Sequence, residues 1–156
     1  MRELDETHKE ILFDRFGINN YRAWEVTQIY EICDAHGWIK PCAYQGIYNS
    51  VHRAVEPKLF PCRRHYEMSF YAYSPLGVAF FAGNLRGERE VEKGSRFDPQ
   101  KLQGRSPTAR YWNDVYFGVR EKVRPVVEKH GWSLAEVALR WMTYHGQLGK
   151  RIQMRS

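Results

Sequence analysis

The spacing of apolar residues predicts a helix over residues 22–35. Four apolar side chains in this segment fall at i, i+3, i+4 and i+7, which places them on one helical face: Val26, Ile29, Tyr30 and Cys33. Gly37 follows, and glycine just past the last periodic residue is a common stop signal. We therefore expect an amphipathic helix that ends near residue 36.

Two further helices are predicted in the first half of the chain. Apolar residues among charges indicate a short amphipathic helix over residues 4–14. A second helix is expected over residues 53–65, where Pro57 and Pro61 weaken the pattern. The polar stretch 84–113 is rich in helix breakers and is predicted to be a long loop, which in a compact domain is usually functional or mobile.

Two helices are predicted to close the chain. The first spans residues 114–129, and the second begins with the capping box Ser133-x-x-Glu136. One stripe of the second helix carries six residues of largely apolar character: Leu134, Val137, Ala138, Trp141, Met142 and His145. We expect this stripe to face a core.

Short apolar segments between the first helices are predicted to be strands. They lie at residues 16–18, 42–45 and 68–73, and Pro41 favours a start of the second strand at Cys42. Strands that alternate with helices form βαβ units and a parallel sheet. The sequence therefore predicts the α/β class, in which ligands bind at the carboxyl ends of the strands.

Amide and tyrosine side chains cluster around these predicted strand ends. The residues concerned are Asn19, Asn20, Gln45 and Tyr73. An amide both donates and accepts hydrogen bonds, which suits a carboxamide, and a tyrosine ring stacks on a flat heterocycle. Taken singly, an Asn after a strand is usually a turn residue and a strand Tyr usually belongs to the core. Their conjunction favours a nicotinamide site.

Composition supports one folded domain. The chain has 156 residues, of which 43% are hydrophobic and 15% aromatic, enough for a core. The net charge of +6 favours anionic partners such as phosphorylated cofactors or nucleic acid, although a solvated basic surface is the commoner explanation. No nucleic-acid motif accompanies the charge, so we expect no nucleic-acid partner.

Cysteine usage and hydropathy bear on the setting of the protein. The three cysteines are odd in number and far apart, so neither a disulfide framework nor a metal site is expected. No run of about 18 apolar residues occurs, and the first residues lack the apolar core of a signal peptide. A cytoplasmic protein without a membrane partner is the expectation.

Four stretches of the sequence resemble the aldo-keto reductases, most closely the aflatoxin-aldehyde reductase subfamily and its fungal secondary-metabolism relatives. They are "FGINNYRAWEV", "YQGIYNSVHRAVEPKLFPCRRH", "FYAYSPLGVAFFAG" and "VALRWMTYHGQL". The resemblance implies a partial (β/α)8 TIM barrel that covers about strands 5 to 7 with their helices. It implies one domain over residues 1–148 and a divergent polar tail over residues 149–156.

The resemblance also implies a cofactor and a substrate class. Members of the family reduce aldehydes and ketones with NADPH bound across the strand ends. By resemblance, Asn19, Asn20 and Gln45 bind the nicotinamide carboxamide and Tyr73 stacks on its ring. The following loop approaches the pyrophosphate through its backbone and includes Ser74, Pro75, Leu76, Gly77 and Gly83.

The family places its catalytic Asp, Tyr, Lys and His on strands 1 to 4, and the resemblance implies that these are absent here. We therefore assign no catalytic residue and expect no turnover by this chain alone. A complete barrel needs roughly 200 residues or more. Strands 5 and 7 would then be open edges that invite pairing with another chain. Two hypotheses follow: a truncated NADPH-dependent reductase of secondary-metabolite biosynthesis, or a non-catalytic remnant that binds a full-length relative or another protein.

Overall fold

The structure of the chain is a computed structural model that describes residues 1–77, 81, 111 and 114–146. These residues form two compact units. The sheet unit contains residues 1–48, 53–73 and 145–146, and the helical unit contains residues 49–52, 74–77, 81, 111 and 114–144.

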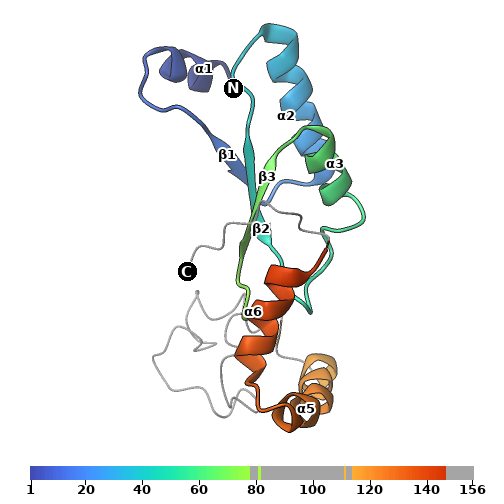
Figure 1. Cartoon of the computed structure of the whole chain (residues 1–156). Coiled ribbons are helices and arrows are strands. Elements are labelled where there is room, and N and C mark those ends of the chain that lie inside the picture. The colour runs from blue at the N-terminus through green and yellow to red at the C-terminus, as the bar shows by residue number, and fades with distance from the viewer. Residues whose placement is uncertain (78–80, 82–110, 112–113, 147–156) are drawn as a thin grey trace, which may run out of the picture. The chain divides into compact units, whose positions relative to one another are not determined.

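A parallel three-stranded sheet forms the centre of the sheet unit. Its strands are β1 (Gly17–Asn19), β2 (Ala43–Ile47) and β3 (Ser69–Tyr73), in the order β1-β2-β3. The two crossovers contain α2 (Ala23–His36) and α3 (Leu59–His65), which Figure 1 shows alongside one another. The predicted parallel α/β arrangement is confirmed, and among the described residues β1 and β3 each pair with β2 alone.

The core of the sheet unit lies between the strands and these two helices. Strand alternation turns every second side chain toward the helices, so that Phe70 of β3 meets Phe60 of α3 with ring centroids 5.0 Å apart. Tyr48 also packs edge-on against Phe60, at 5.0 Å. The other fully or nearly buried apolar residues of this core are Val26, Cys33, Tyr44, Leu59, Met68 and Ala72.

Gly46 is a position where only glycine fits this core. A Cβ there would lie 2.8 Å from Cε1 of the Tyr44 ring and 3.3 Å from the Phe70 ring. We expect Gly46→Ala to lower the free energy of unfolding by about 1–3 kcal/mol, because overpacking forces ring or backbone shifts. Urea unfolding measures this. Gly118→Ala is the matched control, since a Cβ at Gly118 meets nothing within 4 Å, and it should be neutral or slightly stabilising.

Helix α2 matches its prediction at both ends. The Glu25 carboxylate accepts a hydrogen bond from the Arg22 N–H at the first turn. Gly37 adopts φ 65°, the left-handed conformation that glycine supplies cheaply at a helix end.

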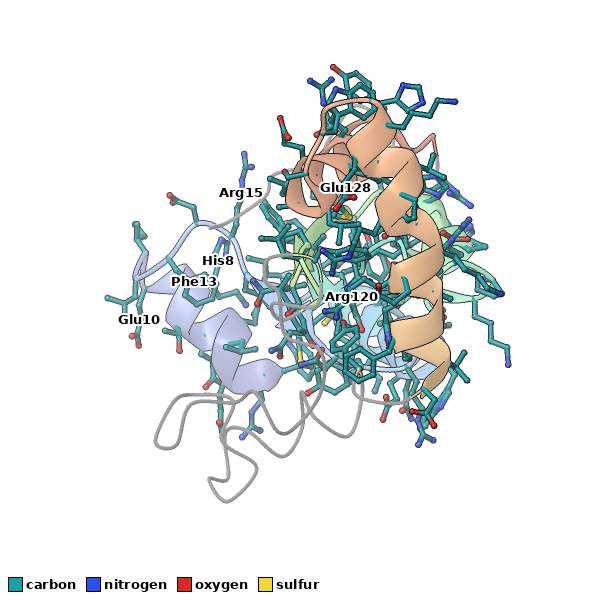
Figure 2. All side chains as sticks on the ribbon, turned by 90° about the horizontal axis from the view of Figure 1, so that it is seen from below. His8, Glu10, Phe13, Arg15, Arg120 and Glu128 are labelled. Carbon is teal, nitrogen blue, oxygen red and sulfur yellow. The ribbon has the colours of Figure 1, made fainter. Side chains whose placement is uncertain are left out.

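Helix α1 spans only Arg2–Lys9, so the prediction of a helix over residues 4–14 is wrong beyond Lys9. The chain turns at Ile11, which takes φ 60° although it is not glycine. Ile11 is 83% exposed, so the apolar residues that predicted the helix do not form a buried face. Figure 2 shows Phe13, which follows this turn, beside His8 of α1, with ring centroids 5.6 Å apart.

Helix α3 begins at Leu59, six residues later than predicted for 53–65. Pro57 disfavours helical backbone at the residue before it and has no N–H, which excludes the earlier start. Pro61 is tolerated because it falls in the first turn, where a backbone donor has no acceptor within the helix. His52, which precedes the predicted helix, forms an isolated bridge with Asn49.

The helical unit contains α5 (Asp114–Lys129) and α6 (Leu134–Tyr144), as predicted. The capping box is present: Glu136 N–H donates to Ser133 Oγ at 3.1 Å, and Ser133 N–H donates to Glu136 Oε2 at 2.8 Å. On the predicted stripe, Ala138 and Met142 are buried. Ala138 joins a cluster with Phe81, against which pack Val51, Leu76, Tyr116 and Leu134.

Tyr111 departs from the predicted loop over residues 84–113. It is helical and 1% exposed, and its ring packs edge-on against Tyr116 with centroids 5.8 Å apart. The prediction of a loop is therefore wrong at this residue. The other residues of 84–113, with Gly83, lie outside the described part of the chain.

Candidate functional site

Three predicted site residues meet at the carboxyl end of the sheet. Asn20 directly follows β1, and Tyr73 is the last residue of β3. The Tyr73 hydroxyl donates to Asn20 Oδ1 at 2.9 Å, and the Asn20 N–H donates to the Gln45 carbonyl at 3.3 Å. Because β2 lies between β1 and β3, the side-chain bond links strand ends that are not neighbours in the sheet.

Asn20 owes its position to an uncommon backbone conformation. Its φ is 60°, in the left-handed region that few non-glycine residues adopt, although Asn does so more readily than most. Such conformations persist where the surroundings fix them, and they concentrate at functional sites. The two hydrogen bonds of Asn20 provide that fixation.

Asn19 and Gln45 occupy one row across the sheet. The register pairs Asn19 with Gln45 and Gln45 with Tyr71, so their side chains share the sheet face opposite the buried tyrosine of β2. Both are exposed. The prediction that Gln45 ends its strand is wrong, because β2 continues to Ile47 and Gln45 lies in its middle.

This row lines a hollow of about 630 Å³. Asn19, Gln45 and Tyr71 contribute to it, but the rest of its wall comes largely from the amino ends of the strands, including Gly17 and Ser69. The hollow therefore extends away from Asn20 and Tyr73. Tyr71 was missed by the sequence analysis, although strand alternation from Tyr73 places it on the same face.

Tyr44 supports the strand-end cluster from the helical side of the sheet. Its hydroxyl donates to the Tyr21 carbonyl at 2.7 Å, one residue beyond Asn20. Burial, with a smaller contribution from Tyr73 and Glu25, raises the pKa of Tyr44 to about 12. The phenol therefore remains protonated and able to donate at neutral pH.

The predicted phosphate loop starts with a tight turn in the helical unit. The Gly77 N–H donates to the Ser74 carbonyl at 2.9 Å, with Pro75 at the second position, where its fixed φ suits a turn. Ser74 has φ 56° and Gly77 has φ 58°, both left-handed. The Leu76 side chain packs on the Phe81–Ala138 cluster.

A second polar cluster in the sheet unit surrounds Glu56. Arg53 binds its carboxylate in bidentate fashion, at 2.7 and 3.0 Å, and the fully buried Tyr48 donates its hydroxyl to Oε1 at 2.5 Å. His145 Nε2 lies 3.3 Å from the same oxygen. The Arg53 bond, followed by those of Tyr48 and His145, lowers the pKa of Glu56 to about 2 against the cost of burial.

Tyr48 is consequently a structural phenol. Burial first, and then the hydrogen bond to Glu56, raise the pKa of Tyr48 well above that of an ordinary tyrosine. A group with such a pKa holds its proton and does not act as an acid near neutrality.

Two further properties concern the described residues alone. None of the helices in this part of the chain is long and apolar enough to cross a membrane. Within the same residues, no group of three or more His, Cys, Asp or Glu side chains is placed to hold a metal ion.

The fold and the sequence comparisons point to an oxidoreductase family. Residues 1–153 match the sequence profile of the Aldo/keto reductase family, and the chain therefore belongs to that family. Its three parallel strands with helical crossovers are consistent with part of a TIM barrel.

Relatives of this chain carry reductase names. It is 44% identical over 151 residues to aldo-keto reductase pigE of Monascus ruber, covering 95% of this chain and 44% of that protein. It is 34% identical over 156 residues to aflatoxin B1 aldehyde reductase member 2 of Rattus norvegicus, covering 95% and 42%. Oxidoreductase sirO of Leptosphaeria maculans is 34% identical over 148 residues, covering 95% and 44%. The chain spans about half the length of the curated relatives it matches.

Proposed function

We propose that this chain supplies the nicotinamide-binding part of an NADPH-dependent reductase that acts on an aldehyde or ketone in secondary-metabolite biosynthesis. The observation that carries the proposal is the linkage of Tyr73, Asn20 and Gln45 at the carboxyl end of the sheet. Membership of the aldo/keto reductase family supports it. The protein would work in the cytoplasm, which suits its free cysteines Cys33, Cys42 and Cys62.

The exposed amides fit a carboxamide. Asn19 and Gln45 lie side by side across the sheet, and each presents a donor and an acceptor to the same face. The Asn20 side-chain Oδ1 accepts a hydrogen bond from the Tyr73 hydroxyl, which fixes the amide, and its NH₂ group would be a further donor to the carboxamide. NADPH supplies a hydride when bound. The residues of this chain bind and orient its nicotinamide. Tyr73 is partly exposed, so its ring is available to stack on the nicotinamide ring.

The turn at Ser74 to Gly77 is proposed to bind the cofactor pyrophosphate. Gly77 has the left-handed φ that glycine adopts without strain, and it carries no Cβ to hinder approach of a phosphate. Its own N–H is used within the turn, so the donors to a phosphate would be other groups of the segment, such as the Ser74 hydroxyl.

NADPH binding by the purified chain tests the proposal. Gln45→Met removes the amide at nearly constant size, and we expect it to weaken NADPH binding about tenfold, the effect of one lost hydrogen bond to a buried polar group. Titration of NADPH fluorescence measures the dissociation constant. Gln28→Met, the same change at an exposed position of α2, is the control and should leave binding unchanged.

A second ligand separates the nicotinamide from the rest of the cofactor. 2′-Phospho-ADP-ribose lacks the nicotinamide, so Gln45→Met should leave its affinity as in the unchanged chain. Equal weakening of both ligands would contradict a carboxamide role for Gln45. Absence of NADPH binding by the unchanged chain would overturn the proposed function for these residues.

Turnover by the chain alone is not part of the proposal. A general acid of this kind needs a tyrosine whose pKa is lowered by a neighbouring lysine. At the strand ends that the structure describes, no lysine neighbours a tyrosine. Consumption of NADPH on addition of an aldehyde to the purified chain would show this part of the proposal to be wrong.

A second candidate function is supported by the edges of the sheet. Among the described residues, β1 and β3 each pair on one side only, and exposed strand edges are templates for pairing with another chain. On this hypothesis the chain is non-catalytic and binds a full-length reductase of its own family. Co-purification of the two supports it, and a monomeric chain at every concentration, with or without the reductase, contradicts it.

A further inference from the structure

The side chain of Asn49 has a hydrogen-bond partner for each of its polar groups. Asn49 lies two residues after β2 and is completely buried. Its Nδ2 donates to the Ser74 carbonyl and to the Tyr111 hydroxyl oxygen, both at 2.9 Å, and its Oδ1 accepts from the Val51 N–H at 3.1 Å. The backbone N–H of Asn49 also donates to the His52 carbonyl, and the backbone carbonyl of Asn49 accepts from the His52 N–H.

These contacts define which way the amide faces. The Val51 N–H is only a donor and the Ser74 carbonyl only an acceptor. In a reversed amide, the NH₂ group would face the Val51 N–H and Oδ1 would face the Ser74 carbonyl, and neither pair can form a hydrogen bond. An aspartate of the same shape has no NH₂ group, and an apolar residue would leave the carbonyl and the N–H unbonded. The site therefore selects asparagine by chemistry as well as by size.

The Ser74 carbonyl is where this amide acts on the predicted phosphate turn. It accepts two hydrogen bonds, one from Asn49 and one from the Gly77 N–H that closes the turn. Ser74 also has φ 56°, a left-handed conformation that costs free energy for any residue but glycine. Such a conformation persists only when neighbouring contacts over-determine it, and the Asn49 bond is such a contact.

Tyr111 holds the amide on its other side. Its hydroxyl oxygen accepts the second Nδ2 proton, and its buried ring packs on His52 and Tyr116 with centroids 6.4 and 5.8 Å away. Three segments that are distant in the sequence thus meet at one side chain. An amide held from both sides confines the Ser74 carbonyl more tightly than a single surface contact would.

From these contacts we infer that Asn49 is a positioning residue that holds the Ser74–Gly77 turn in the conformation that receives the cofactor phosphates. The inference rests on the proposed function for its ligand, NADPH, but the positioning itself is a property of the chain without ligand. Asn49 reaches the ligand only through Ser74.

Asn49→Asp tests the inference, because it keeps the acceptor for Val51 and removes the donor to Ser74. We expect about tenfold weaker binding of both NADPH and 2′-phospho-ADP-ribose at neutral pH, in contrast to Gln45→Met, which affects NADPH alone. Amide exchange at Gly77, measured without ligand, should accelerate about tenfold or more. Tyr111→Phe is the comparison: it keeps the bond to Ser74 and removes only the second Nδ2 acceptor, so ligand affinity and Gly77 exchange should change much less than in Asn49→Asp.

A double-mutant cycle with Ser74→Gly separates positioning from general support of the fold. Glycine adopts the left-handed conformation freely, so the loss caused by Asn49→Asp should shrink markedly in the Ser74→Gly background. An undiminished loss in that background would overturn the inference. So would unchanged Gly77 exchange in Asn49→Asp.

Two other results have defined meanings. If Asn49→Asp does not fold, Asn49→Ser removes the donor without introducing a carboxylate, and failure of both to fold would assign Asn49 to the fold and overturn the inference. If the unchanged chain binds no NADPH, the proposed function fails while Gly77 exchange still decides the positioning role.

Discussion

Replacement of Phe60 by alanine should lower the free energy of unfolding of the sheet unit by about 3–5 kcal/mol. Phe60 is fully buried, and its ring contacts those of Tyr48 and Phe70, each at a centroid distance of 5.0 Å. The Arg63 guanidinium lies 5.0 Å from the same ring centroid. Truncation removes one partner from all three contacts and leaves a cavity that a rigid aromatic neighbourhood cannot close.

Urea unfolding followed by tryptophan fluorescence measures this effect. A loss of this size is a large fraction of the stability of a typical small domain, about 5–15 kcal/mol, so the urea midpoint of Phe60→Ala should fall strongly. Trp24→Ala is the control, since Trp24 is 59% exposed on α2 and should change stability by less than about 0.5 kcal/mol. Similar losses from both changes would show that α3 does not pack on the sheet as described.

Replacement of Glu56 by glutamine should lower stability by about 2–3 kcal/mol at neutral pH and progressively less in acid. The pKa of Glu56 is about 2 in the folded chain, against an ordinary value of 4.5, and its side chain is 18% exposed. A depressed pKa means that the carboxylate stabilises the fold fully above pH 4.5. That contribution is lost as the pH falls toward about 2, because the unfolded chain then binds the proton more tightly.

The difference between the unchanged chain and Glu56→Gln, followed by urea unfolding from neutral pH into acid, isolates this contribution. Other carboxylates titrate equally in both proteins and cancel. Glu10→Gln is the control, since it makes the same change in charge. Glu10 is exposed just past α1 (Figure 2), so its replacement should change stability little at any pH. A stability gap that stays constant between neutral pH and acid would mean that Glu56 is not held by Arg53 and Tyr48.

The sequence was informative wherever a local signal set the structure. Helix α2 follows an uninterrupted apolar face with a glycine stop, and α6 begins at a capping box that the structure contains. Where no such signal exists, the prediction failed. The end of α1 depends on a left-handed isoleucine, Ile11, and neither glycine nor proline marks it. Tyr111 was assigned to a loop because its sequence neighbours are polar, and its burial comes from distant contacts.

The candidate site divides in the same way. Amides and a tyrosine at strand ends were visible in the sequence, and the structure brings Asn20, Gln45 and Tyr73 together. Their roles toward a cofactor stay predictions. Asn49 could not have been selected, because its role depends on hydrogen bonds to Ser74 and Tyr111, which are distant in the sequence, and a lone Asn after a strand is most often a turn residue.

The register of the sheet has a consequence for the order in which it assembles. Gly17 pairs with Ala43 and Ala43 pairs with Ser69, so the two crossovers enclose segments of equal length. The chain entropy lost in closing them is therefore the same, and it cannot favour one over the other. Packing decides instead: the second crossover brings Phe60 onto Phe70 and adds a five-residue strand, whereas β1 has only three residues. We therefore expect the β2–α3–β3 segment to form first and β1 to add to a strand that already exists.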